Sequence, residues 1–156
     1  MNKIVSRPVI AQLAKRLRRR GKKIVFTNGT FDILHLGHVT YLERARRMGD
    51  LLIVGVNTDR SVRSYKDPNR PVNSQSDRIR VLSALACVDY AVLFDEPTPL
   101  RLICSIKPHI LVKGADWKKR EIAGAKEVES WRGRVRRLPL LRNRSTTRTL
   151  RRLGVL

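Results

Sequence analysis

A run of six residues from Leu51 to Val56, apolar apart from Gly55, is the feature that most limits how this 156-residue chain can fold. A strand that is apolar on both faces belongs inside a parallel sheet covered on both sides, and not in a half-exposed antiparallel sheet. Further short runs predict four more strands. They cover residues 24–28, 90–94, 110–112 and 135–138.

Apolar residues at helical spacing separate these runs and predict an alternation of strands and helices. The predicted helices cover residues 8–19, 38–48, 76–86, 99–105, 121–131 and 146–153, and residues 57–74 form a loop with one helical turn. This alternation predicts an α/β fold, a Rossmann-like single domain with a five-stranded parallel sheet and helices on both faces. Residues 1–23 form an N-terminal helix and basic lead-in, and residues 24–156 form the domain.

The chain carries 34 Lys and Arg against 13 Asp and Glu, a formal net charge of +21. This excess of positive charge favours anionic partners, which include phosphorylated small molecules, nucleic acid and acidic lipid. It is also compatible with a basic surface that is simply solvated. No apolar run approaches the roughly 20 residues that cross a bilayer, and no signal-peptide core follows the N-terminus. We therefore expect a soluble, cytoplasmic protein without membrane insertion.

Cys87 and Cys104 have neither CxxC nor Cys/His metal spacing. Both follow apolar stretches, where a buried free thiol is the usual state. We expect no disulfide and no metal bound by the protein.

His35 and His38 lie in the segment that joins the first predicted strand to the helix beginning near Gly37. Histidines at positions i and i+3 of a helix start share a face, and the free N–H groups there favour an anion. Gly37 removes a side chain where a phosphate must approach closely. No third zinc ligand lies nearby, and neither a P-loop nor a dinucleotide-binding glycine motif occurs. The pair therefore predicts phosphoryl chemistry.

The residues 29–32, Gly-Thr-Phe-Asp, followed by 35–38, His-Leu-Gly-His, resemble the signature of the cytidylyltransferase-like nucleotidyltransferase family. The resemblance covers nearly the whole chain from residue 24 onward. Within that family the chain is most similar to the heptose 1-phosphate adenylyltransferases, which make ADP-heptose for lipopolysaccharide cores. The stretches that carry this finer similarity are 26–29, 54–59, 70–73, 77–78, 111–117 and 145–147.

The resemblance implies a transfer of AMP from ATP to a sugar 1-phosphate, with Mg²⁺ carried by the ATP phosphates, in a homodimer. It implies that His35 and His38 are catalytic and that Lys66 contacts the sugar phosphate. Residues 113–116 border the base and ribose, and residues 145–148 hold the β- and γ-phosphates. The implied nucleotide-binding residues are Thr30, Phe31, Asp32, Gly37, Arg78, Lys113, Gly114, Asp116, Ser145, Thr146, Thr147 and Arg148.

Two of these residues have alternative roles. Asp32 orients either the turn or a sugar hydroxyl, and Arg78 contacts the triphosphate or the base edge. The chain also departs from the family before Ser145, where it has Arg142-Asn143-Arg144 in place of a small acidic turn containing glycine. This departure leaves the choice of substrate open, but not the type of reaction.

Two other functions stay open at this stage. One is a CTP-dependent glycerol- or alcohol-phosphate cytidylyltransferase, because the sequence does not display base choice by a physical rule. The other is a basic nucleic-acid-binding protein, suggested by the charge of +21. Against the second, aromatic residues make up only 5% of the chain and no base-stacking motif occurs, so we expect no specific nucleic acid partner.

Overall fold

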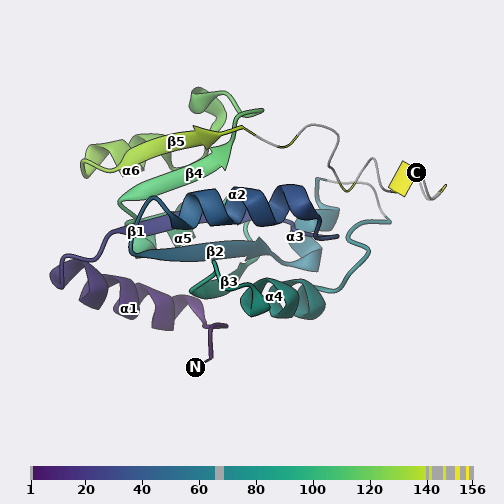
Figure 1. Cartoon of the computed structure of the whole chain (residues 1–156), viewed down its shortest axis with the longest axis horizontal. Helices are drawn as coiled ribbons and strands as arrows, with labels where there is room; N and C mark the ends of the chain where they lie inside the picture. The colour runs from purple at the N-terminus through teal and green to yellow at the C-terminus, as the bar shows by residue number, and fades with distance from the viewer. Residues whose placement is uncertain are drawn as a thin grey trace.

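A parallel five-stranded sheet forms the centre of the computed structural model, which describes residues 2–65, 69–139, 141, 146, 150, 151 and 154 (Figure 1). The strands are β1 (Ile24–Gly29), β2 (Leu51–Asn57), β3 (Tyr90–Phe94), β4 (Ile110–Gly114) and β5 (Arg134–Leu138). Their order is β3-β2-β1-β4-β5, and every neighbouring pair is parallel. The predicted fold class is confirmed. The order reverses between β1 and β4, which is where α/β sheets bind ligands beyond their carboxyl ends.

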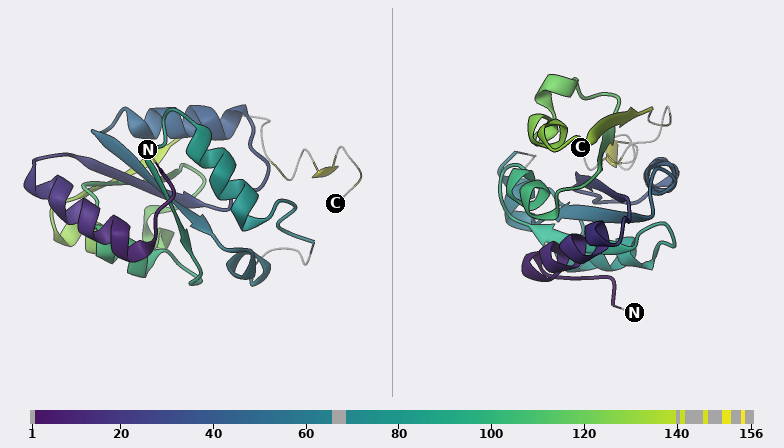
Figure 2. Two further views of the ribbon diagram at one scale, coloured as in Figure 1. Left: turned by 90° about the horizontal axis from the view of Figure 1, so that it is seen from below. Right: turned by 90° about the vertical axis from the view of Figure 1, so that its left-hand side faces the viewer.

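Helices cover both faces of the sheet (Figure 2). One face is covered by α1 (Arg7–Arg19), α5 (Leu100–Ile106) and α6 (Ala125–Ser130). The other face is covered by α2 (Leu36–Arg46) and α4 (Gln75–Ala84). The short helix α3 (Asp59–Arg63) follows β2, and a 3₁₀ helix, η1 (Lys119–Glu121), follows β4.

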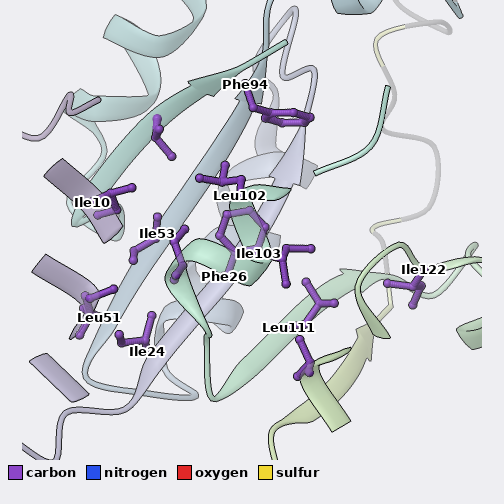
Figure 3. Close-up of a cluster of buried hydrophobic side chains, with 14 of the residues drawn as sticks. Ile10, Ile24, Phe26, Leu51, Ile53, Phe94, Leu102, Ile103, Leu111 and Ile122 are labelled. Atoms are coloured by element: carbon purple, nitrogen blue, oxygen red, sulfur yellow. The ribbon is translucent and has the colours of Figure 1, made fainter. Parts of the chain in front are cut away.

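Alternating residues of each strand point into two separate cores. In β1, Ile24 and Phe26 join the cluster beneath α1, α5 and α6, whereas Val25 joins the cluster beneath α2 and α4. Figure 3 shows the first cluster, where Ile53 of β2 and Leu102 of α5 lie beside Phe26. Because successive strand side chains point to opposite faces, a strand buried on both sides is apolar at most of its positions.

The N-terminal helix is part of this core. Ile10 and Ala14 of α1 are fully buried against the sheet, while Lys15, Arg16 and Arg19 are exposed. Because these positions fall on opposite sides of one helix, the basic cluster of α1 faces solvent while its apolar side packs on the domain.

The structure corrects three element boundaries. Helix α2 begins at Leu36 and not at residue 38, so His35 is its N-cap residue and His38 lies in its first turn. Strand β4 continues to Gly114, so Lys113 lies within it. The helix predicted over 121–131 is divided into η1 and α6, because Gly124 between them has a φ of +83° that no helix accommodates. The helix predicted over 146–153 falls mostly outside the described residues.

Gly124→Ala should destabilise the fold more than Gly21→Ala. Both glycines have positive φ, +83° and +70°, so a Cβ costs about 1 kcal/mol of backbone strain at either position. At Gly124 the new Cβ would also lie 2.7 Å from Ile103 Cδ1, whereas nothing lies within 4 Å at Gly21. This crowding adds about 1–3 kcal/mol. The free energies of unfolding in urea measure the difference, and equal losses would show that Ile103 moves aside freely.

Two expectations from the sequence concern the surface. None of the helices in the described part of the chain is long and apolar enough to span a membrane.

Both cysteines are free, as predicted. Cys87 is only partly buried and Cys104 is exposed, so their predicted burial is wrong. Cys104 lies in α5, on a side that does not face the sheet.

Candidate functional site

A pocket of about 350 Å³ lies at the carboxyl ends of β1 and β4, where the strand order reverses. We call it the β1–β4 pocket. Ten of the residues predicted from the sequence line it: Thr30, Phe31, Asp32, His35, Gly37, His38, Lys113, Gly114, Asp116 and Thr146. The predicted site residues Lys66, Ser145, Thr147 and Arg148 lie outside the described residues.

The two histidines stand at the start of α2. His35 is the extended N-cap residue, with φ −143° and ψ 169°, and the His38 N–H donates to the His35 carbonyl at 2.9 Å. Their rings stack with centroids 3.9 Å apart and planes 18° apart. Within the described residues no side chain caps α2, and its first turn contains no acidic residue. The positive end of the helix dipole is therefore available to an anion beside both imidazoles.

His38 is held neutral at physiological pH. The pKa of His38 is lowered to about 4, mainly by burial and also by the charge of His35, while the Ile33 carbonyl opposes the shift. The edge of the Phe31 ring packs against it at a centroid distance of 5.4 Å. The Nδ1 atom of His38 and the Oδ1 atom of Asn28 are buried, with no hydrogen-bond partner among the described residues. Unsatisfied buried polar atoms require an explanation, and a ligand in this pocket supplies one.

The neutral state of His38 predicts a loss of stability in acid. Its pKa of about 4 in the folded protein is below the ordinary 6.5, so the stabilisation is complete above about pH 6.5 and is lost as pH falls through about 4. The free energy of unfolding of the wild type should fall over this interval by on the order of 1–3 kcal/mol more than that of His38→Gln, which does not titrate there. Urea unfolding at pH 7 and pH 4 tests this, and equal losses in both proteins would contradict it.

The β4 side of the pocket carries a lysine, a carboxylate and an aromatic ring. The Lys113 Nζ donates to the Asn28 carbonyl at 3.2 Å and lies 5.2 Å from the centre of the Trp117 ring. Burial lowers the pKa of Lys113 to about 8, while Asp116 opposes that shift. Trp117 is 44% exposed although it is large and apolar, and it lines the pocket. An apolar ring beside polar groups suits a base and ribose.

Asp32 is a buried anchor for the segment that follows residue 69. Its carboxylate accepts hydrogen bonds from the Arg70 Nε at 2.7 Å, the Val72 N–H at 3.0 Å and the Asn73 N–H at 2.9 Å. The Asn73 side chain also donates to the Asp32 carbonyl at 2.7 Å. These contacts support the turn role expected for Asp32, since its oxygens are already engaged by the protein.

The structure places Arg78 outside the lining of the β1–β4 pocket. Its side chain is fully buried. Its guanidinium donates to the carbonyls of Asn73, Thr30 and Asn57 and to the carboxylate of Asp59, at 2.5–3.1 Å. Because Nε, Nη1 and Nη2 are all engaged, Arg78 supports the loops behind the pocket, and the geometry does not favour the direct nucleotide contact expected from the sequence.

Six further residues line the pocket and were not predicted from the sequence. They are Asn28, Gly29, Tyr41, Arg70, Trp117 and Leu141. Four of them could have been found from the sequence, since Asn28, Gly29, Arg70 and Trp117 fall in the stretches that resemble the heptose 1-phosphate adenylyltransferases.

Tyr41 is one helical turn from His38, and its hydroxyl is hydrogen bonded to that of Thr27 at 2.8 Å. Burial raises the pKa of Tyr41. At the other rim, the Thr146 hydroxyl donates to the Ile33 carbonyl at 3.2 Å.

Comparison with curated proteins finds close relatives of larger size. The chain is 53% identical over 136 residues to the bifunctional protein HldE of Syntrophotalea carbinolica, covering 87% of this chain and 28% of that protein. It is 48% identical over 152 residues to the bifunctional protein HldE of Pelobacter propionicus, covering 97% of this chain and 31% of that one. The chain thus spans less than a third of the length of these relatives.

Solved structures extend the comparison. The lipopolysaccharide core biosynthesis protein from Thermoplasma volcanium matches with a TM-score of 0.63 and 30% identity, covering 78% of this chain and 98% of that one. A pantoate-beta-alanine ligase from Francisella tularensis, at 18% identity and a TM-score of 0.66, shares the fold. The sequence model of the family described as Cytidylyltransferase-like matches residues 26–152. With the His35–His38 pair and the pocket in place, this match shows that the chain belongs to the cytidylyltransferase-like family.

Proposed function

We propose that this chain is an adenylyltransferase that joins ATP and heptose 1-phosphate to give ADP-heptose and pyrophosphate, for the lipopolysaccharide core. The observation that carries the proposal is the stacked His35–His38 pair at the uncapped start of α2, inside the β1–β4 pocket. The names of the relatives support the pathway, since one is a lipopolysaccharide core biosynthesis protein.

The proposed reaction is an in-line displacement at the α-phosphorus of ATP. An oxygen of the sugar phosphate forms the new P–O bond, and the bond to the bridging oxygen of pyrophosphate breaks. The attacking oxygen is already ionised at neutral pH, so no general base and no covalent enzyme intermediate are needed. His35, His38 and the first turn of α2 would hold the α-phosphate and stabilise the charge that develops on it.

The nucleotide would lie on the β4 side of the pocket. Trp117 offers an apolar face to the base, and Asp116 offers a carboxylate to the ribose. Thr146, which lines the pocket, fits a contact with the outgoing pyrophosphate.

Mg²⁺ in this proposal is held by the phosphate oxygens of ATP, where it would neutralise negative charge. The protein groups fit such an arrangement. Asp32, which lines the pocket, is engaged by Arg70 and two backbone N–H groups. No group of three or more potential metal ligands is present within the described residues. Mg²⁺ prefers phosphate oxygens and water to a cage built by the protein.

Pyrophosphate release with a matrix of substrates tests the proposal. ATP and CTP are each combined with heptose 1-phosphate, hexose 1-phosphates and glycerol 3-phosphate, in the presence of Mg²⁺. We expect the largest kcat/KM for ATP with heptose 1-phosphate. A preference for CTP with glycerol phosphate would identify the alternative cytidylyltransferase instead.

The nucleic-acid-binding alternative has a separate test, because charge alone gives affinity that disappears with salt. Sequence-selective binding that survives at about 0.2 M salt would favour it over the enzyme. The homodimer and the cytoplasmic location expected from the sequence stay predictions.

A further inference from the structure

Two buried arginines lie near the pocket, and only one of them has donors to spare. Arg78 uses Nε, Nη1 and Nη2 in four hydrogen bonds to the protein. Arg70 is 5% exposed, and its Nε donates to Asp32 at 2.7 Å. Within the described part of the chain, neither Nη1 nor Nη2 of Arg70 makes a hydrogen bond to the protein. Since Arg70 also lines the β1–β4 pocket, those donors are available to a ligand there.

Asp32 fixes the direction of the Arg70 guanidinium. The side chain of Asp32 is 1% exposed and accepts two backbone N–H bonds besides the one from Arg70. A guanidinium held through Nε presents its two Nη groups in a plane, which is the fork that binds two oxygens of a phosphate. The Arg70 side chain is 6% exposed, so water compensates its charge only in part, through the small accessible surface that opens on the pocket. An anionic ligand in the pocket would supply the missing partners.

The position of Arg70 indicates which phosphate it meets. It follows β2 and α3 in the chain, whereas Lys113, Asp116 and Trp117 belong to β4 and the turn after it. β2 and β4 are the two neighbours of β1 and therefore lie on opposite sides of it. With the nucleotide on the β4 side and the histidines at the end of β1, the space on the β2 side is left for the second substrate.

We propose that Arg70 binds the phosphate of the acceptor substrate, oriented by its Nε contact to Asp32. The inference rests on the proposed function for the identity of that acceptor, a sugar 1-phosphate. Arg70 is a substrate-binding residue in this assignment, and Asp32 is a positioning residue that acts through it. The charge of Arg70 offsets the repulsion between the attacking phosphate and the triphosphate as the two approach.

Four variants separate phosphate binding from a purely structural role. Arg70→Met removes both the Nη donors and the contact to Asp32, and Arg70→Lys keeps the charge. Asp32→Asn weakens the same contact but leaves the guanidinium. Arg80→Met removes an exposed arginine of α4 that lies outside the pocket lining, and is the matched control for loss of one positive charge.

The measurement is the KM for heptose 1-phosphate compared with the Kd for ATP. In Arg70→Met we expect the KM to rise about 10- to 100-fold, as for a lost charge-assisted hydrogen bond, with the Kd for ATP within about 3-fold of wild type. Arg70→Lys should recover part of this loss. In Asp32→Asn the KM for heptose 1-phosphate should rise by a smaller factor than in Arg70→Met, with the Kd for ATP again within about 3-fold of wild type. In Arg80→Met neither constant should change by more than about 2-fold.

Two results would overturn the inference. One is a weaker ATP affinity in Arg70→Met with an unchanged KM for the acceptor, which would assign Arg70 to the triphosphate. The other is an equal effect of Arg70→Met and Asp32→Asn on both constants, which would leave only the structural contact. If Arg70→Met does not fold, the comparison of Arg70→Lys with the wild type decides between the same outcomes.

A binding experiment keeps this inference apart from the proposed function. Calorimetry measures heptose 1-phosphate binding to the wild type and Arg70→Lys after saturation with α,β-methylene-ATP. Weaker binding to the variant supports the role of Arg70 even if no ADP-heptose is formed, in which case only the proposed function fails. Equal binding to both proteins would overturn the inference whatever the activity.

Discussion

His38→Ala and His35→Ala are each expected to lower kcat by on the order of 10²- to 10³-fold, the usual cost of one lost donor to a developing oxyanion. The effect should fall mainly on kcat, because the charge that the imidazoles stabilise grows as the P–O bonds exchange. The rings stack with centroids 3.9 Å apart over one helix start, so in the proposed reaction both would contact the same phosphate. Steady-state pyrophosphate release measures the loss.

The third histidine of the chain provides the control. His109 lies outside the pocket lining, where its Nδ1 accepts a hydrogen bond from the Ile24 N–H at 2.9 Å. His109→Gln should leave kcat within about 2-fold of wild type at a temperature where it is folded. In His35→Ala/His38→Ala the losses should not multiply, because groups that act as a unit are not additive. Wild-type turnover in both single variants would remove the catalytic role of the pair.

Arg78→Met should cost about 3–5 kcal/mol of unfolding free energy, a large share of the stability of a domain of this size. The Arg78 side chain is fully buried, and its ion pair with Asp59 has an N–O distance of 2.7 Å. The substitution leaves that carboxylate without its cation and the carbonyls of Asn73, Thr30 and Asn57 without their donor. Urea unfolding followed by circular dichroism gives the difference.

An exposed ion pair gives the matched comparison. Arg60 pairs with Asp95, and the Arg60 side chain is 84% exposed. Arg60→Met should therefore change the free energy of unfolding by less than about 1 kcal/mol. If Arg78→Met and Arg60→Met cost the same, the hydrogen bonds of Arg78 contribute little. A nucleotide affinity lost in Arg78→Met with full stability retained would restore the direct contact expected from the sequence.

Local patterns determined most of the fold. The apolar residues 51–56 and the shorter runs predicted all five strands, since central strands that are buried on both faces are mostly apolar. The ends of the helices were predicted less accurately than the strands. Helix α2 extends to Leu36, and Gly124 divides a predicted helix through its positive φ, which apolar spacing does not reveal.

The sequence by itself also located the candidate site. His35 and His38 are three residues apart at a predicted helix start, so their spacing placed them together after the first strand. Their spacing, and the glycine between them, predicted an anion site without knowledge of any distant contact. The pocket found there contains both residues.

Only the tertiary structure showed that Arg70 and Arg78 are buried and which groups each of them contacts. Arg70 meets a carboxylate 38 residues earlier in the chain, and Arg78 meets a carbonyl 48 residues earlier. Both are basic residues in polar stretches of a chain with 34 Lys and Arg, so composition cannot distinguish a buried arginine from a solvated one. Burial and hydrogen bonding of these arginines depend on which distant segments the fold brings together. The spacing of apolar residues along the sequence predicts only local secondary structure, so it does not reveal such contacts.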